Sequence, residues 1–93
     1  MNRDNLIDLL NKTYPKLNAR ISEEFDGRPN GIWVSGESGH TASDEHPLFS
    51  YYNEDYKEVR YVFGIHKEVR DLIEPQGWYC EWYDAGTIII SEE

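Results

Sequence analysis

The sequence of 93 residues predicts a single α+β domain over residues 1–93, with a mainly antiparallel sheet of about five to six strands and two helices packed on one face. Two segments have apolar residues at helical spacing, and several others alternate apolar and polar residues or are rich in aromatic and β-branched ones. Strands and helices do not alternate in the regular manner of parallel βαβ units. The predicted order of elements is therefore α-β-β-β-β-α-β-β.

The first helix and the first hairpin are predicted within residues 1–36. Asp4 is expected to cap the helix and Pro15 to end it. The apolar stripe of this helix recurs at spacings of three and four, at Leu6, Leu9, Leu10 and Tyr14. The segment KLNARISEEF then alternates, so we expect a half-buried strand with an inner face formed by Leu17, Ala19, Ile21 and Phe25. DGRPNG is typical of a turn, and GIWVSGE is the predicted returning strand.

The second half is expected to contain a loop, a second hairpin, a helix and a final hairpin. GESGHTASDEHP, residues 36–47, lacks apolar periodicity and is predicted to be an irregular surface loop. LFSYYN and VRYVFGIH are predicted to pair across EDYKE, and the later strand is expected to direct to one face Val59, Tyr61, Phe63 and Ile65. HKEVRDLIEPQG has helical spacing and ends in proline and glycine. WYCEWY and TIIIS are the last two predicted strands, around a turn at residues 84–86.

Cysteine usage and the N-terminal sequence indicate the compartment. A single cysteine, Cys80, excludes an internal disulfide framework and a multi-cysteine zinc site, and it fits a reducing environment. Charged residues interrupt the apolar run of MNRDNLIDLL, so neither a signal peptide nor a membrane span is expected. The sequence therefore predicts a cytoplasmic protein that does not bind membranes.

The net charge of −9 is distributed unevenly along the chain. Residues 1–36 carry five basic and five acidic side chains, residues 37–70 carry four and seven, and residues 71–93 carry six acidic side chains and no basic one. Such a field repels nucleic acid and anionic lipid and attracts a cationic partner. We therefore expect a basic protein surface as the partner and no direct binding of nucleic acid. The alternative is that the acidic surface only keeps the protein soluble.

Carboxylates and tyrosines are interspersed in SYYNEDYKE and WYCEWYD, a pattern typical of protein-binding surfaces. Alternation along a strand predicts that Trp78, Cys80 and Trp82 face the core, and that the residues between them face outward on an open sheet face. Alternatively, the outward tyrosines cover the second face of the sheet and contact only neighbouring strands. The predicted partner-binding residues are Glu37, Asp44, Glu45, Tyr51, Tyr52, Glu54, Asp55, Tyr79, Glu81, Tyr83 and Asp84.

Catalytic and metal-binding patterns are weak. HTASDEH, residues 40–46, brings two histidines and two carboxylates together, but the histidines are six positions apart in a loop rather than one helical turn apart. We therefore expect no metal, no cofactor and no enzyme activity, with a small metal-dependent hydrolase using His40 and His46 as an alternative. Cys80 is predicted to be an inert core thiol. His66, at the start of a predicted helix, is expected to cap it rather than to perform chemistry.

The tail GWYCEWYDAGT, which follows YVFGIHKEVRDLIE, resembles the ends of short uncharacterised proteins of phages and other mobile elements. The resemblance covers about the last third of the chain and includes no catalytic motif. It implies an anti-defence inhibitor in the host cytoplasm, of the anti-restriction or anti-CRISPR type, and some such proteins imitate the phosphates of nucleic acid. The predicted function is a non-enzymatic acidic protein in the basic groove of a nucleic-acid-handling protein. A self-associating module, pairing through a strand edge such as TIIIS, is the alternative, so a monomer and a homodimer are both open.

Overall fold

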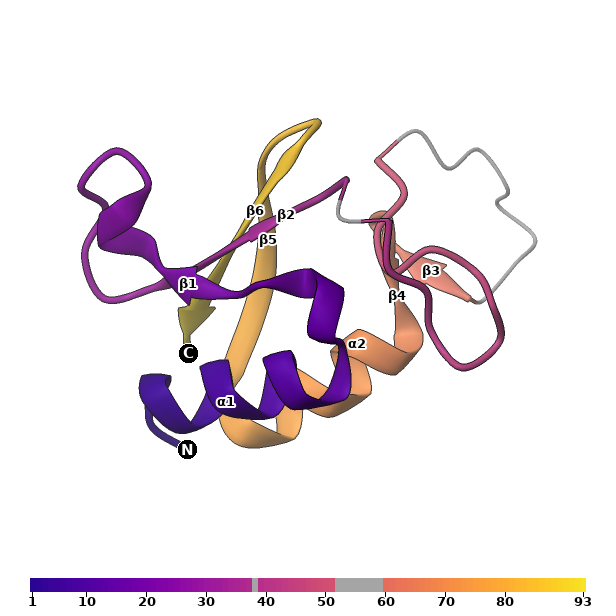
Figure 1. Ribbon diagram of the computed structural model, residues 1–93, viewed down its shortest axis with the longest axis horizontal. Helices are drawn as coiled ribbons and strands as arrows, with labels where there is room; N and C mark the ends of the chain where they lie inside the picture. The colour runs from indigo at the N-terminus through magenta and orange to yellow at the C-terminus, as the bar shows by residue number, and fades with distance from the viewer. Residues whose placement is uncertain (38, 52–59) are drawn as a thin grey trace.

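The computed structural model describes residues 1–37, 39–51 and 60–93. Its helices are α1 (Arg3–Thr13) and α2 (Lys67–Ile73), with short 3₁₀ turns at η1 (Pro15–Leu17), η2 (Ser22–Glu24) and η3 (Glu74–Gln76). Its strands are β1 (Arg20–Ile21), β2 (Ile32–Ser35), β3 (Tyr61–Val62), β4 (Ile65–His66), β5 (Trp78–Asp84) and β6 (Thr87–Glu92). The predicted α+β class is confirmed, and the helices and strands follow one another in the predicted order (Figure 1).

The strands form two antiparallel sheets in the described part of the chain. The main sheet has the order β1-β2-β6-β5, and β3 pairs only with β4. Because β6 pairs with β2 on one side and β5 on the other, Ile89 lies between Trp33 and Glu81. TIIIS is thus a central strand and not the exposed edge that the self-association hypothesis expected. β5, the other strand of the C-terminal hairpin, is an edge strand of the main sheet.

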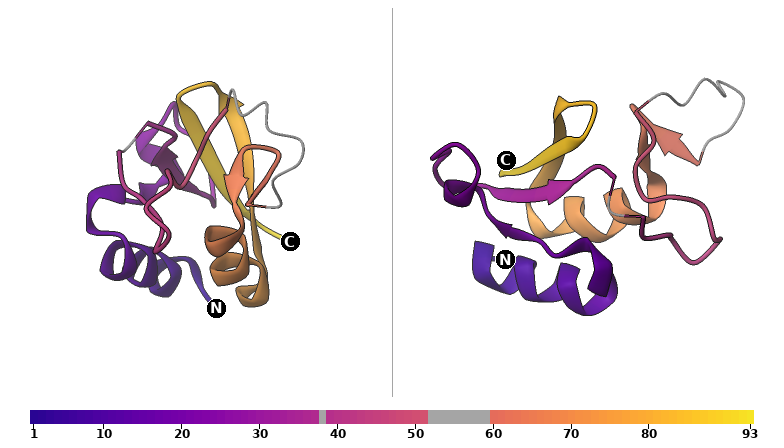
Figure 2. Two further views of the ribbon diagram at one scale, coloured as in Figure 1. Left: turned by 90° about the vertical axis from the view of Figure 1, so that its right-hand side faces the viewer. Right: turned by 45° about the horizontal axis from the view of Figure 1, so that its top comes forward.

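Both helices cover the same face of the main sheet, as predicted (Figures 1 and 2). The core between these layers is formed by aliphatic side chains that are completely buried, including Leu6, Leu10, Ile32, Val69, Ile73, Ile88 and Ile90. The cap of α1 is Asn2, whose side chain accepts a hydrogen bond from the amide of Asn5 at 2.9 Å. Asp4, the predicted cap, lies instead in the first turn, where a negative charge stabilises the helix dipole.

The segment of residues 16–25 is not the continuous strand that its alternation predicted. Only β1 within it is extended, and η1 and η2 flank it. Ser22, expected on the polar face, is completely buried. Its hydroxyl donates to the Arg28 carbonyl at 2.6 Å and accepts from the Gly31 amide at 2.8 Å, so two internal partners replace water. A polar residue that finds such partners can be buried at a much lower energetic cost than one left without them, and it can therefore break an alternating pattern.

The predicted pairing of LFSYYN with VRYVFGIH is confirmed only in part, since the His66 amide donates to the Leu48 carbonyl at 2.9 Å and the Ser50 amide donates to the Gly64 carbonyl at 2.7 Å. The β3–β4 hairpin lies entirely within VRYVFGIH and turns at Phe63 and Gly64, which have φ of 52° and 76°. Phe49 contributes only an isolated bridge to Ile65. Ile65 is buried whereas Phe63 is 89% exposed, so these residues do not share a face, and Val59 lies outside the described residues.

Gly64 explains why the chain turns there. A Cβ atom at this position would lie 2.6 Å from the Ser50 carbonyl oxygen and 3.2 Å from the Trp82 ring, and the left-handed backbone is itself strained for other residues. The turn therefore depends on a glycine that both bends the chain and allows a close approach.

Neither α1 nor α2 has the length and apolar character needed to cross a bilayer, and the rest of the described chain contains no such helix.

Candidate functional site

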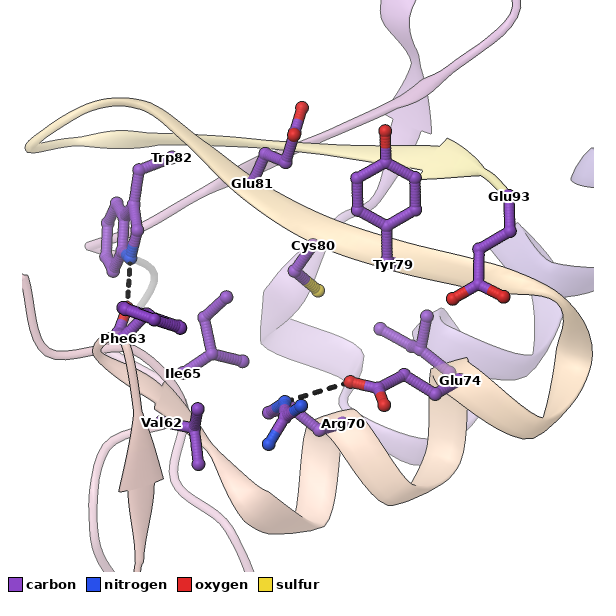
Figure 3. Close-up of a pocket in the computed structure, with 11 residues that line it drawn as sticks. Val62, Phe63, Ile65, Arg70, Glu74, Tyr79, Cys80, Glu81, Trp82 and Glu93 are labelled. Atoms are coloured by element: carbon purple, nitrogen blue, oxygen red, sulfur yellow. Dashed lines mark hydrogen bonds and ion pairs between the residues drawn. The ribbon is translucent and has the colours of Figure 1, made fainter.

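The stretch WYCEWYD forms β5, and its alternate residues face opposite sides of the strand as predicted. Trp78 is 3% exposed, and Cys80 and Trp82 pack against the hydrophobic core. Figure 3 shows the Cys80 sulfur directed toward α2, whereas the Tyr79 and Glu81 side chains extend to the other side of the strand. The strand therefore contributes apolar side chains to the core and a carboxylate to the surface.

The second face of the main sheet, expected to be open, is partly covered by an aromatic cluster. The Phe25 ring stacks on Trp33 with 5.2 Å between ring centres, and Tyr83 packs edge-on against Phe25 at 5.0 Å. The Arg28 guanidinium carbon lies 4.8 Å from the centre of the Tyr83 ring. Beneath this cluster Ile89 is only 6% exposed. Tyr83 thus covers its own sheet, as the alternative interpretation expected, although it remains 45% exposed.

A groove of about 490 Å³ lies between β5, α2 and the β3–β4 hairpin (Figure 3), and we call it the edge groove. Its apolar lining comes from elements that follow one another along the chain and includes Val62, Phe63, Ile65, Ile73, Cys80 and Trp82. Burial raises the pKa of the Cys80 thiol to about 12. The sulfur is therefore protonated at neutral pH and forms an apolar part of the lining.

The backbone of β5 presents an unpaired edge to this groove. The Gly77 carbonyl accepts a hydrogen bond from the Glu93 amide at 2.9 Å, which places Gly77 and Glu93 in a hydrogen-bonded pair. Such pairs alternate along an antiparallel ladder, so the backbone groups of Tyr79 and Glu81 face β6 and those of Cys80 and Trp82 face outward. Within residues 1–37, 39–51 and 60–93, no backbone or side-chain hydrogen bond reaches these outward groups.

The rim of the edge groove is acidic. Arg70 is bound by Glu74 at 2.9 Å, an ion pair one helical turn apart (Figure 3). Glu81 and Glu93 also line the groove and form no ion pair with any residue that the structure describes. Since the one arginine of the lining is already matched by Glu74, the remaining carboxylates give the groove a net negative charge.

Trp82 holds the β3–β4 hairpin beside β5. Its indole nitrogen donates to the Phe63 carbonyl at 2.6 Å (Figure 3). Its ring lies so close to Gly36 that a Cβ atom there would come within 2.8 Å of it. This anchoring fixes the hairpin backbone while the Phe63 side chain remains 89% exposed at the groove. A large apolar side chain in that position is available for contact with another molecule.

A second polar group, which we call the loop cluster, ties the 39–47 loop to α2. His66 caps α2 by accepting from the Glu68 amide at 3.0 Å, as predicted, and its Nε2 lies 2.9 Å from Asp44 Oδ2. Asp44 also accepts from Arg60 Nε at 2.9 Å. Desolvation opposes ionisation of Asp44, but hydrogen bonds from the His46 amide, His66 and Arg60 lower its pKa to about 2. Both ring nitrogens of His66 therefore have partners within the chain.

Glu68 completes the loop cluster. It accepts hydrogen bonds from the Tyr14 hydroxyl at 2.6 Å and from the Ser43 amide at 3.1 Å, and the Ser43 hydroxyl also donates to it. The bonds from Ser43 and Tyr14 lower the pKa of the Glu68 carboxyl. Burial, reinforced by the neighbouring Glu68, raises the pKa of the Tyr14 phenol. A carboxylate with a lowered pKa is a weak base, so the arrangement fits a structural clamp better than an activated serine.

The remaining predicted partner-binding residues do not form one continuous surface. Glu37 and Asp84 converge at the β5–β6 turn, since a Cβ atom on Gly86 would lie 3.8 Å from an oxygen of each. Glu45 is exposed in the 39–47 loop, and Tyr51 packs edge-on against Trp82 with 5.0 Å between ring centres. Tyr52, Glu54 and Asp55 lie outside the described residues.

His40 and His46 have separate surroundings. The His40 ring contacts the Tyr14 ring edge-on at 5.3 Å, and His46 is exposed. Among the residues that the structure describes, no group of three or more histidine, cysteine or acidic side chains is arranged to hold a metal ion.

Comparisons of the chain with protein-family models, with curated proteins and with solved structures find no significant match.

Sequence reasoning identified the β5 residues of the edge groove but missed its other walls. Val62 and Ile65 were expected only as parts of a strand, and Ile73 only as part of the apolar face of a helix. The available signal was the pair Phe63-Gly64, because a glycine inside a strand pattern indicates a bend and would have ended the strand there.

Proposed function

We propose that this chain is a non-enzymatic binding protein whose acidic C-terminal hairpin docks on a basic protein surface. The observation that carries the proposal is the concentration of carboxylates without a described ion pair around the C-terminal hairpin, where residues 71–93 include no basic side chain. Glu23, Asp44 and Glu74 each bind an arginine of the same chain. By contrast, the carboxylates around β5 and the β5–β6 turn form no ion pair with any described residue, and these are Glu37, Glu81, Asp84, Glu92 and Glu93. Unmatched charges of one sign attract a partner of the opposite sign.

The basic surface that we propose is the nucleic-acid groove of a nucleic-acid-handling protein, such as a host defence enzyme. Lysine and arginine supply most of the affinity of such grooves for phosphate, so a surface of carboxylates is a physically reasonable competitor. The net charge of −9 and the resemblance of the tail to phage and mobile-element proteins support this choice. In this role the chain acts as an inhibitor in the cytoplasm of the host cell.

The side chains best suited to catalysis already have structural roles, which favours binding over chemistry. His66 caps a helix and bonds Asp44, and Cys80 is a protonated thiol beside the core. The Ser43 hydroxyl donates to Glu68, which is a poor base. A binding role needs none of these groups to be free.

The proposal is tested by isolating the partner from host lysate with the full chain and measuring its dissociation constant as salt is varied. We expect affinity to fall at least about tenfold between about 50 mM and about 500 mM NaCl, because screening weakens exposed charge pairs. The double variant E37K/D84K is expected to bind at least about tenfold more weakly at low salt. The chain is also expected to displace nucleic acid from the partner.

The matched control is D8K, which changes an exposed carboxylate on α1 that forms no ion pair with a described residue. It changes the net charge in the same direction by half as much as the double variant, and it lies on α1 rather than on the C-terminal hairpin. Equal weakening by D8K and by the double variant would contradict a localised acidic site. Binding that is unchanged by salt would contradict the electrostatic mechanism, and failure to displace nucleic acid would contradict the proposed partner class.

A further inference from the structure

The edge groove combines three features that together suit an extended peptide. It has an unpaired strand edge with an apolar lining on the α2 side, and the Glu81 carboxylate extends from the other side of the same strand (Figure 3). From these features we propose that β5 accepts a partner segment as an additional strand of the main sheet, with apolar side chains alternating with lysine or arginine. The inference deepens the proposed function, on which it rests for the charge of the partner.

Backbone pairing supplies the first part of the recognition. The amide and carbonyl groups of Cys80 and Trp82 face away from β6, and no described residue bonds them. An extended segment beside them would satisfy these groups, as in other cases of strand addition to a sheet edge. The four residues 79–82 line the groove, so a segment of about four residues covers this edge at roughly 3.3 Å per residue.

The alternation of side chains along the added strand supplies the second part of the recognition. Side chains on the α2 side of the added strand would enter the apolar lining beside Ile65, Ile73 and Cys80. The volume of about 490 Å³ is within the range of about 300–1,000 Å³ that is usual for ligand pockets. Phe63, which is 89% exposed, would lose contact with water when the segment binds.

The charge of the site determines which residues of the added segment would alternate with its apolar residues. Side chains on the opposite face of the added strand would lie beside Tyr79 and Glu81, which extend to that side (Figure 3). Glu81 and Glu93 form no ion pair with a described residue, whereas Arg70 is already matched by Glu74. A lysine or arginine in the segment could therefore form an ion pair with one of these carboxylates, and the paired Arg70 would repel it little.

A second copy of this chain fits the same edge poorly. Antiparallel pairing of two β5 strands about their centres would bring the two Glu81 side chains close together, and like charges across a strand pair are destabilising. Each copy also carries a net charge of −9. Glu81 and the irregular register between Trp82 and Asp84 are features that limit pairing between identical edges.

The experiment uses the full chain and an acetylated, amidated nine-residue peptide that alternates lysine and valine. One control peptide has proline at the central valine, which removes a backbone donor, and a second has the same composition in two blocks. Fluorescence anisotropy gives the dissociation constants, and NMR hydrogen exchange follows the amides of Cys80 and Trp82. We expect the alternating peptide to bind at least about tenfold more tightly than either control and to slow exchange at these two amides.

Chain variants test the two halves of the proposal separately. F63A and E81K are each expected to weaken peptide binding several-fold, while D8K is expected to leave it unchanged. Phe63 and Glu81 are both exposed, so neither variant removes a core contact, and the dispersion of the NMR spectrum confirms the fold.

The remaining outcomes overturn the inference in distinguishable ways. Equal binding of all three peptides, with E81K still weakening it, would reject strand addition and leave the acidic binding function standing. Binding of the alternating peptide that is insensitive to salt and to E81K would reject the proposed charge of the partner. No binding, no slowing of exchange, or a dimer in sedimentation with these amides already protected would each reject the proposed occupant.

Discussion

Carboxylates have opposite roles in the loop cluster and at the edge groove. In the loop cluster, Asp44 and Glu68 accept hydrogen bonds from His66, Arg60, Ser43 and Tyr14 and join the 39–47 loop to α2. At the edge groove, Glu81 is exposed and forms no ion pair with a described residue. Net charge alone therefore does not locate a binding surface. The informative quantity is the charge left over after the internal pairs have formed.

Trp82 connects the sheet to the β3–β4 hairpin, so its removal is expected to have the largest effect on stability. We expect W82A to lower the free energy of unfolding by about 3 kcal/mol, within the usual range for loss of a packed aromatic residue. W82F keeps a ring but loses the hydrogen bond to Phe63 and should cost less, about 1–2 kcal/mol. Urea unfolding measures both, and a loss below about 1 kcal/mol for W82A would contradict the anchoring role.

Glu68 and Glu81 provide the direct comparison between a paired and an unpaired carboxylate. E68A leaves the Tyr14 hydroxyl without its acceptor and should destabilise the fold by about 2 kcal/mol. E81A removes no internal hydrogen bond and should change stability by less than about 0.5 kcal/mol. Both values come from urea unfolding at neutral pH. Similar losses for the two variants would remove the distinction between the regions.

Acid should weaken the loop cluster through Asp44. Its pKa in the folded chain is about 2, below the ordinary value of 3.8, so the ionised form is favoured by folding. The resulting stability is present above about pH 4 and is lost as pH falls toward 2. The lowered pKa of Glu68 acts in the same direction.

The variant D44N tests this assignment. It is expected to be less stable than the natural sequence at pH 6 and to lose less stability between about pH 5 and pH 2, because one of the responsible groups is absent. Unfolding followed by circular dichroism across this range gives the two curves. Parallel curves would show that Asp44 does not contribute to the pH dependence.

The smallest expected effect on stability is that of E81K. This substitution places a lysine at an exposed position and reduces the excess negative charge of the chain. Thermal unfolding should show a change within about 0.5 kcal/mol, of either sign. Binding to a basic partner should nevertheless fall strongly, so a large stability loss would indicate an internal role for Glu81 that the structure does not show.

Much of the fold can be predicted from local sequence patterns, whereas less of the candidate site can. The stripe of α1 and the parity of β5 follow from periodicity, because each is decided by one segment facing one core. The alternating pattern placed Ser22 wrongly on a polar face, because its hydrogen-bond partners, Arg28 and Gly31, lie in the next loop. The pattern also placed Phe63 wrongly on one strand face with Ile65, because the chain turns at Phe63 and Gly64.

The edge groove depends on information that local patterns lack. Its walls come from the β3–β4 hairpin, α2 and β5, and β5 is an edge only because β6 pairs with the distant β2. Such a pairing is chosen by contacts between segments far apart in sequence, which alternation in one segment does not specify. The position of Glu81 on the exposed side of β5 was predictable, whereas the groove beside that strand was not.

The proposed binding site depends on the free edge of β5, which can be measured by amide hydrogen exchange of the chain alone. Because Tyr79 and Glu81 pair with β6, their amides should exchange slowly, while the amides of Cys80 and Trp82 should exchange much faster. This alternation along one strand is the predicted result. Equal, strong protection of all four amides would show that the edge is already paired and would contradict the proposed binding site.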